Sequence, residues 1–390
     1  APVARLSGKP AAGAGLVMRV TTIVLAAILA LPGCDSADPP GSGSDFAILA
    51  QAAEGFAQAQ PEHALEFPRD HGAHADFRIE WWYLTANLTG DDGQIYGAQW
   101  TLFRTAVQPP GSIQPVNAWQ SGQVYMAHFA LTGPDQHFAF QRYARGGVHQ
   151  GEGRSGAMTG PFAAWLDDWK LASLGSDFLP LEVQARQDDH AVRLLLESDR
   201  PLVLQGDRGF SQKHSGGGGS YYYSHPFLRA GGELIIDGRK VAVEGNAWLD
   251  REWSSQFLQP DQSGWDWFSL HLDSGEKLML FRLRSGGSSA HTGSDFQHGV
   301  LIEPDGDKHT LDPAQIELQA IGFEQVAGRR LPLLWTIHLP EIDRALTVQA
   351  LHPDQWMDVD FPYWEGVVTA TGEGPGNNGV GYLELTGYAR

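Results

Sequence analysis

Hydrophobic and polar residues alternate in short runs from Phe77 to the end of the chain. The run FRIEWWYLTANL (77–88) is followed by TGDDGQ and then by IYGAQWTLFR (95–104). Alternation with a period of two is typical of strands that bury one face, and Asp-Gly between two such runs indicates a hairpin. Similar runs follow, separated by Gly and Pro, with one short helical pattern at 45–60. The pattern predicts an all-β protein of antiparallel barrels or sandwiches.

The first hairpin pattern recurs in the second half of the chain. The segment WWYLTANLTGDDGQIYGAQWTLFR (81–104) is similar to WDWFSLHLDSGEKLMLFRLR (265–284). Each has a Trp-rich strand, a turn with an acidic residue and Gly, and a second strand that contains Phe-Arg. The repeat predicts two related β-domains, 61–240 and 241–390, that divide near residues 239–241 and carry Trp81 and Trp265 at comparable positions.

The N-terminal region has the layout of a secretory signal. MRVTTIVLAAILALPGC starts at Met18 with one Arg, continues with an apolar run and ends at Cys34. The apolar run is too short for a permanent membrane span. We therefore expect residues 1–33 to be a removed leader with upstream residues, and 34–60, rich in Ser, Gly, Ala and Gln, to be a flexible tether.

The letters LPGC resemble the lipobox of bacterial lipoproteins. The resemblance implies that Cys34 carries a lipid and becomes the first residue of the mature protein. Cys34 is the one Cys in the chain, so no disulfide can form within it. We expect a lipid-anchored protein of the cell envelope that faces the periplasm.

The charge of the chain argues against nucleic acid as a partner. It has 46 acidic and 27 basic side chains, for a formal charge of -19. A protein with this excess of carboxylates repels phosphates. The hydrophobic content of 42% is sufficient for a sizeable core.

The stretch RDHGAHADFRIEWWYLT (69–85) concentrates ionisable and aromatic residues. His71 and His74 could ligate a metal together with Asp70 or Asp76, but the spacing specifies no third ligand and fits no standard zinc pattern. The alternative is a pair of hydrogen-bonded loop histidines that close one end of a barrel. We expect the second arrangement and no metal.

Six blocks occur in order along the chain: FPRDHGAHADFRIEWWYLTANL, MAHFALT, KHSGGGGSYYYSHPFLR, VEGNAWLDREWSSQFL, GWDWFSLHLDSGEKLMLFRLR and YWEGVVTATG with GYLELTGY. Together they resemble the AttH/CrtC family, which includes proteins described as secreted hydrolases and the carotenoid 1,2-hydratases. The resemblance covers residues 61–390 and implies two tandem lipocalin-like antiparallel β-barrels. No G-x-S-x-G motif is present, so a Ser nucleophile has no support.

Carboxylic acids beside tryptophans suit the chemistry of a hydratase. Addition of water to an isolated C=C bond requires an acid that protonates carbon, which a buried neutral carboxyl supplies, and aromatic faces that stabilise the carbocation. Asp250, Glu252 and Asp266 are the candidate acids. An Asp–Arg–Glu salt-bridge cluster that pins a barrel seam is the structural alternative for residues 250–252. The candidate ligand-binding residues are Trp248, Trp253, Trp265, Trp267, Tyr222 and Trp82.

Two functions stay open at this stage. One is a hydratase of carotenoid-type C=C bonds that needs no cofactor. The other is a non-catalytic carrier of an apolar small molecule or lipid, associated with an envelope ABC transporter. The segment Asn246-Ala247-Trp248 keeps the Trp of the family's hydratase sequence His-Asn-Trp but has Asn in place of its His.

Overall fold

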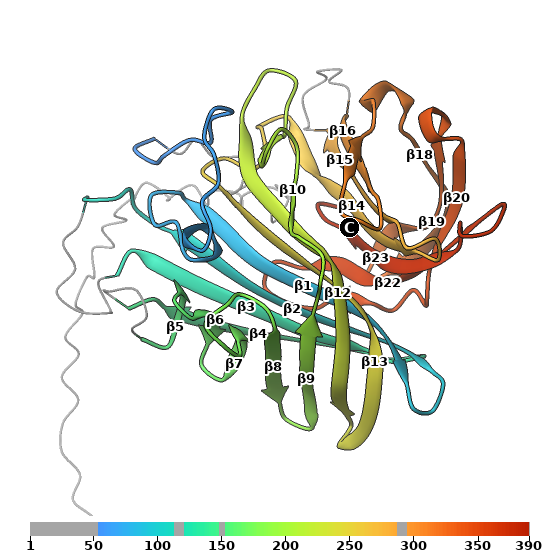
Figure 1. The fold of residues 1–390 in the computed structure, drawn as a ribbon, viewed down its shortest axis with the longest axis horizontal. Helices are drawn as coiled ribbons and strands as arrows, with labels where there is room; N and C mark the ends of the chain where they lie inside the picture. Colours follow the sequence, from blue (N-terminus) through green and yellow to red (C-terminus); the bar gives the residue numbers. More distant parts are fainter. Residues whose placement is uncertain (1–53, 113–120, 148–152, 287–294, 390) are drawn as a thin grey trace, which may run out of the picture. The chain divides into compact units, whose positions relative to one another are not determined.

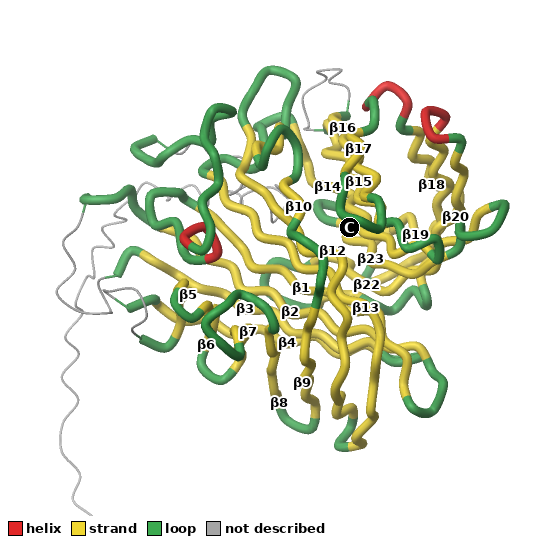
Figure 2. Tube along the Cα trace, viewed as in Figure 1, coloured by secondary structure: helices red, strands yellow, loops and turns green. Residues whose placement is uncertain are grey.

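The computed structural model describes residues 54–112, 121–147, 153–286 and 295–389, all within one compact unit, Ser42–Arg390. The predicted all-β class is confirmed: antiparallel strands dominate and the helices are single 3-10 turns (Figure 2). The strands form two sheets, of which one is a nearly closed barrel and the other a half-barrel. No helix in the described ranges is long and apolar enough to span a membrane. The predicted leader, the greater part of the tether and Cys34 lie outside the described residues.

The first sheet has the strand order β4-β3-β2-β1-β13-β12-β9-β8-β7-β6-β5, with β10 and β11 also paired to β12 (Figure 1). Its elements are the 3-10 turn η2 (Arg69–His71) and β1 (Ile79–Gly90), β2 (Ile95–Ala106), β3 (Gln123–Thr132), β4 (His137–Arg145), β5 (Ser155–Thr159), β6 (Phe162–Leu166), β7 (Trp169–Ser173), β8 (Leu181–Gln187), β9 (His190–Glu197), β10 (Val203–Leu204), β11 (Phe210–Gln212), β12 (Gly219–Ile236) and β13 (Arg239–Ser254).

The second sheet has the order β17-β16-β15-β14-β23-β22-β20-β19-β18, with β21 paired to β22. Its elements are β14 (Gln262–Leu272), β15 (Lys277–Ser285), β16 (Phe296–Ile302), β17 (Lys308–Thr310), η4 (Pro313–Gln315), β18 (Glu317–Val326), β19 (Arg329–Leu339), η5 (Pro340–Ile342), β20 (Arg344–Ala350), β21 (Trp356–Met357), β22 (Tyr363–Gly372) and β23 (Gly379–Leu385).

The chain passes from one sheet to the other between β13 and β14. The expected division near residues 239–241 falls at the turn of the β12–β13 hairpin, whose two strands pair along most of their length. The change of sheet comes later, at residues 255–261. The sequence repeat did not locate it, because the repeated hairpin begins at β14 while the long strand β13 still belongs to the first sheet.

The central strands are buried on both faces, which explains their nearly continuous apolar runs. In β1, Trp82 and Leu84 enter the core of the first sheet, whereas Tyr83 packs in a third cluster with residues of β14, β15, β22 and β23. In β14, Phe268 enters the core of the second sheet and Trp267 packs in that third cluster. Because side chains alternate along a strand, one face of each sheet closes its own core and the other meets the second sheet.

The strand register corrects the alignment of the repeat. Trp81 is directly opposite Phe103 in the first hairpin, and Trp267 is directly opposite Phe281 in the second. Trp81 is therefore equivalent to Trp267 rather than to Trp265. A shift of two residues keeps every side chain on the same face, so a pattern of period two cannot distinguish the two alignments.

Candidate active site in the cavity between the sheets

A cavity of about 170 Å³ lies where the two sheets meet. Strands β1, β2, β3, β12 and β13 supply one wall, and β14, β15, β22 and β23 supply the other. Its lining is mainly aromatic and apolar, with three acids and three basic residues (one Arg, one His and one Lys): Arg78, Ile79, Trp81, Tyr83, Phe103, Thr105, Met126, His128, Lys213, Tyr222, Asp250, Glu252, Ser255, Phe257, Trp265, Trp267, Phe281, Leu283, Phe361, Tyr363 and Glu384.

Asp250 of β13 is a buried acid whose hydrogen-bond donors are neutral. Its Oδ2 accepts from the Tyr222 hydroxyl at 2.7 Å, and its Oδ1 accepts from Trp248 Nε1 at 2.7 Å and from the Ser224 hydroxyl. Burial raises the pKa of Asp250 to about 7, although these three donors oppose the rise. A large fraction of Asp250 is therefore protonated near neutral pH, inside an aromatic cavity.

Glu252, two residues further on the same face of β13, has a charged partner. Lys213 Nζ lies 2.7 Å from Glu252 Oε1, and the Ser220 hydroxyl donates to the same oxygen. The ammonium of Lys213 also lies over the rings of Phe281 and Phe257, at 4.4 and 5.0 Å from their centroids. Cation–π attraction and the ion pair together hold the buried ammonium in place.

The second sheet contributes two further acids. Glu384 of β23 lines the cavity, and Glu365 of β22 is directly opposite it in the strand register. The side chain of Glu384 is half-buried, since part of its surface faces the cavity. Burial raises the pKa of Glu384 to about 7. Burial and the neighbouring Glu384 raise the pKa of Glu365 well above its usual value.

Aromatic rings from both sheets form the apolar wall. Trp267 meets Tyr83 edge to face at 5.4 Å between ring centroids, and Phe257 meets Trp265 at 5.3 Å and Trp81 at 4.9 Å. Such a wall buries a large apolar area of a ligand and presents ring faces to a developing cation.

Asp266 does not reach this cavity, and its placement corrects the hypothesis that it is a candidate acid. It points into the second sheet, fully buried, because alternation along β14 sends Trp265 and Trp267 to the opposite face. The guanidinium groups of Arg282 and Arg284 bind its two oxygens, and the Tyr388 hydroxyl donates to it at 2.7 Å. This clamp is structural and has a counterpart in the first sheet.

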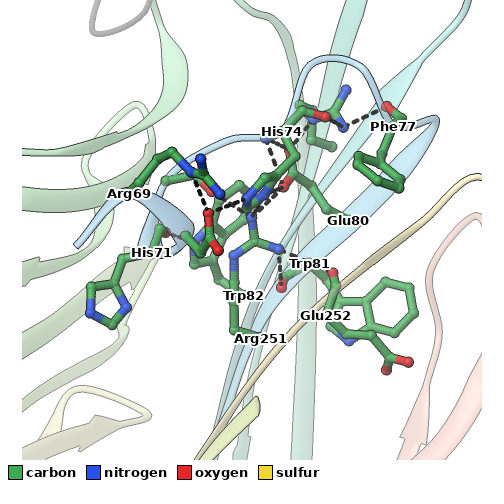
Figure 3. Close-up of polar contacts among 12 residues, drawn as sticks. Arg69, His71, His74, Phe77, Glu80, Trp81, Trp82, Arg251 and Glu252 are labelled. Carbon is green, nitrogen blue, oxygen red and sulfur yellow. Dashed lines mark hydrogen bonds and ion pairs between the residues drawn. The ribbon is translucent and has the colours of Figure 1, made fainter. Parts of the chain in front are cut away.

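The counterpart is Glu80, which Arg104 binds inside the first sheet. Arg251 binds the same carboxylate (Figure 3). Glu80 is opposite Arg104 in the register of the first hairpin, as Asp266 is opposite Arg282 in the second. The guanidinium of Arg251 also stacks on Trp82 at 4.0 Å. Arg251 therefore belongs to an ion-pair network with Glu80. The predicted alternative, a salt-bridge cluster within residues 250–252, is wrong, because Asp250 and Glu252 project to the other side of β13 and line the cavity.

The two histidines of the stretch 69–85, His71 and His74, pack beside this network. His74 donates its backbone N–H to Glu80, hydrogen-bonds Asp70 and Glu80 through its ring, and stacks on Trp253 at 4.0 Å. His71 bonds to the Tyr223 hydroxyl at 2.7 Å. In the described ranges, no group of three His, Cys, Asp or Glu is arranged to hold a metal.

The predicted ligand-binding residues divide between two faces. Trp265, Trp267 and Tyr222 line the cavity, and Trp248 lies behind it, 6.3 Å from the ring of Trp267. Trp82 and Trp253 do not line the cavity: Trp82 packs in the core of the first sheet, and Trp253 packs with Tyr221 and Tyr223 on the same side of β13 as Arg251. They are adjacent in sequence to residues that line the cavity but project from the other side of the strand.

Three charged residues at or beside the cavity were not predicted from the sequence: Lys213, Glu365 and Glu384. The two glutamates stand at alternating positions in YWEGVVTATG and GYLELTGY, so an acid on an otherwise apolar strand was a usable signal. Lys213 comes just before the Gly run at 216–219, which is typical of a loop and gave no sign of a buried charge.

Comparison with known proteins is consistent with this architecture. The sequence profile of the AttH-like family matches residues 58–388. A crystal structure of a Nitrosomonas europaea protein described as AttH is 35% identical, with a TM-score of 0.73, and the match covers 86% of this chain and 100% of that one. No curated protein matches the sequence.

Two more distant structures share the fold. Kievitone hydratase from Nectria haematococca is 15% identical, with a TM-score of 0.63 and coverage of 86% of this chain and 96% of its own. CghA, solved with Sch210972, is 13% identical, with a TM-score of 0.50 and coverage of 87% and 97%. The profile match and the Nitrosomonas structure confirm the resemblance noted in the motif blocks: the chain belongs to the AttH-like family.

Proposed function

We propose that this chain binds an apolar, isoprenoid- or lipid-like molecule in the inter-sheet cavity and adds water to one of its C=C bonds without a cofactor. The observation that carries the proposal is Asp250, a buried acid with neutral hydrogen-bond partners on the wall of an aromatic cavity. The shared fold with kievitone hydratase is in keeping with a hydration reaction.

The cavity supplies the groups that such a reaction requires. The neutral carboxyl of Asp250 gives its proton to the less substituted carbon of the alkene, and the π electrons form the new C–H bond. The rings of Trp265, Trp267 and Phe281 face the cavity and stabilise the tertiary cation. A water molecule then forms the C–O bond and releases a proton to a carboxylate.

A matched pair of variants tests the proposal. Purified protein is incubated with a panel of isoprenoids that end in an isopropylidene group, such as geraniol, farnesol and squalene, and mass spectrometry detects the tertiary alcohol. We expect wild type to hydrate one class of the panel, Asp250→Asn to lose that activity, and the exposed turn variant Asp305→Asn to keep it. A wild type that hydrates no member of the panel would overturn the hydratase proposal.

The second candidate function is a carrier for the same class of ligand. Its support is the apolar lining itself, which holds an alkyl or polyene chain with or without chemistry. Saturable binding of farnesol or a fatty acid, equal in wild type and Asp250→Asn and without any product, is the result expected of a carrier. In this alternative the protein would deliver its apolar ligand to an envelope ABC transporter.

Anchoring is a separate part of the proposal. The LPGC sequence supports lipidation of Cys34 and attachment to the envelope facing the periplasm. Mass spectrometry of the mature N-terminus should find an acylated Cys34 that is lost in Cys34→Ser. An N-terminus without a lipid contradicts the anchor and leaves the cavity chemistry untouched.

A further inference from the structure

Two glutamates face each other across neighbouring strands of the second sheet. Glu365 of β22 is directly opposite Glu384 of β23, and Glu384 is in turn directly opposite Trp267 of β14. Side chains that are directly opposite in an antiparallel pair have Cβ atoms about 4.5–5.5 Å apart, and two like charges at that spacing are destabilising. A sheet that keeps this pair therefore has to keep at least one of the two carboxyls neutral.

The surroundings of the pair leave a shared proton as the means to do so. Among the described residues, no Lys, Arg or His forms an ion pair with either carboxyl, and Lys213, which lines the same cavity, pairs with Glu252. The groups that act on the pair are neutral donors: the Tyr83 and Tyr363 hydroxyls beside Glu365, and the Trp265 indole beside Glu384. Two enclosed carboxyls that face each other without an ion-pair partner behave as a coupled pair that holds one proton.

The two members of the pair differ in access to the cavity. Glu384 lines it, whereas Glu365 does not, and neither oxygen of Glu365 is exposed. Glu384 also feels the charges of Asp250 and Glu252 from the opposite sheet, so the three carboxyls surround the same space. Glu384 is thus placed to touch a bound molecule, and Glu365 can act only through Glu384.

A hydration needs a proton acceptor for the adding water as well as a proton donor for the alkene. Glu252 is the weaker candidate for acceptor, because an ion pair with Lys213 at 2.7 Å and the Ser220 hydroxyl already occupy its carboxylate. Among the described residues, Glu384 forms no ion pair with a Lys or Arg. On the basis of the hydration proposed above, we propose that Glu384, in a proton-sharing pair with Glu365, is the catalytic base, with Glu365 as its positioning residue.

The proton count of the step balances. Asp250 loses one proton to the alkene carbon and becomes a carboxylate. Water forms the C–O bond and loses one proton to Glu384, which becomes neutral. Proton transfer from Glu384 to Asp250 through a water molecule in the cavity restores both groups, and the net change is addition of one H2O to the C=C bond.

Reaction in D2O separates the two steps. Without the base, Asp250 still protonates the alkene, and the cation returns its proton to Asp250, so deuterium enters the recovered alkene while no alcohol forms. We expect Glu384→Gln to lower alcohol formation by about 100-fold or more, with deuterium uptake within a few-fold of wild type. Asp250→Asn should lose both readouts, and the exposed hairpin variant Glu373→Gln should keep both. Equal loss of both readouts in Glu384→Gln, or normal alcohol formation, would overturn the proposed base.

Infrared spectroscopy tests the pair without any turnover. The difference spectrum of wild type minus Glu365→Gln should contain the C=O band of a neutral carboxylic acid at pH 7. In Glu384→Gln the like-charged neighbour of Glu365 is gone. As the pH is raised, Glu365 should therefore ionise, and its band should be lost, at a lower pH than in wild type. Absence of the band at pH 7 overturns the shared proton. If wild type hydrates no substrate, the catalytic role of Glu384 fails together with the proposed function, whereas the proton-sharing pair stands or falls on the spectra.

Discussion

Asp250 and Glu252 stand two residues apart on the same face of β13, yet their partners have opposite character. Lys213 lies 2.7 Å from Glu252, while the Tyr222 hydroxyl and the Trp248 indole donate to Asp250. A cation favours the ionised form of a carboxyl, and burial among neutral donors favours the protonated form. One strand therefore presents an ion-paired carboxyl and a carboxyl with neutral partners side by side, and acid–base chemistry uses such pairs of acids in different environments.

The first prediction concerns the activity of Asp250→Asn. The amide keeps the shape of the carboxyl but carries no transferable proton, so hydration should fall by about 100-fold or more. Binding of the same ligand, measured by isothermal titration calorimetry, should stay within a few-fold of wild type. A variant that binds and hydrates normally contradicts the role of Asp250 as the acid.

The second prediction concerns the pH dependence of hydration. Asp250 acts in its protonated form, and its pKa is raised by burial to about 7. The rate should therefore fall as the pH rises above about 7. It should also fall below that pH, because the proposed base Glu384 acts in its ionised form and burial raises its pKa to about 7. A rate that does not fall between pH 7 and pH 9 would mean that the acid is a group with a higher pKa.

The third prediction concerns the free energy of unfolding of Asp250→Asn. The folded-state pKa of Asp250, about 7, lies above its ordinary value of 3.8, so the unfolded chain releases the proton more readily. The contribution of Asp250 to the stability of wild type should fall as the pH rises from about 4 to about 7, by up to roughly 4 kcal/mol. Asn cannot ionise and avoids this loss. The stability of the variant relative to wild type should rise over that range and then level off, as followed by urea denaturation at several pH values.

The fold could be predicted from the sequence because period-two alternation and Gly-Pro punctuation are local properties. The sequence did not predict which acids face the cavity and which face a core. Asp266 sits between two cavity tryptophans in sequence, and the same alternation that brings Trp265 and Trp267 to the cavity directs Asp266 into the second sheet. Alternation gives the relative faces of neighbouring residues, but the assignment of a face to a core or to the cavity depends on which strands become neighbours.

The pairing of the two acids of the second sheet could not be predicted from the sequence either. Glu365 and Glu384 are unremarkable in sequence until the register places them opposite each other. Register is a property of strand pairing and not of either strand alone. Of the six candidate ligand-binding residues named from the sequence, Tyr222, Trp265 and Trp267 line the cavity where the two sheets meet.

The fourth prediction concerns ligand binding by the aromatic wall. Trp265→Ala removes a ring that lines the cavity, so the affinity for farnesol or a long-chain fatty acid should fall by about tenfold or more, in line with roughly 1.5–3 kcal/mol for a buried apolar side chain. Quenching of Trp fluorescence measures the affinity. Trp165→Ala, on β6 and away from the cavity lining, serves as the control and should bind normally. An equal loss in both variants would indicate damage to the fold.

The last prediction concerns the stability contributed by the Glu80 network. Burial alone would raise the pKa of Glu80, but Arg104 and Arg251 outweigh it and hold the pKa well below its usual range. Glu80→Gln leaves two buried guanidinium groups without their anion, and removal of one partner of a buried ion pair costs about 3–5 kcal/mol. The exposed pair of Arg154 and Asp167 is the matched control, because Asp167→Asn should cost at most about 1 kcal/mol.

The loss in Glu80→Gln should also depend on pH. The depressed folded-state pKa of Glu80 means that its stabilisation is present above the unfolded-state value, near 4.5, and is lost as the pH falls below it. The difference in unfolding free energy between wild type and Glu80→Gln should therefore be constant at neutral pH and shrink on acidification. Urea denaturation at pH 7 and at lower pH measures both effects. An equal and small loss in Glu80→Gln and Asp167→Asn would show that the two arginines find other partners, and that the network holds the barrel end through packing rather than charge.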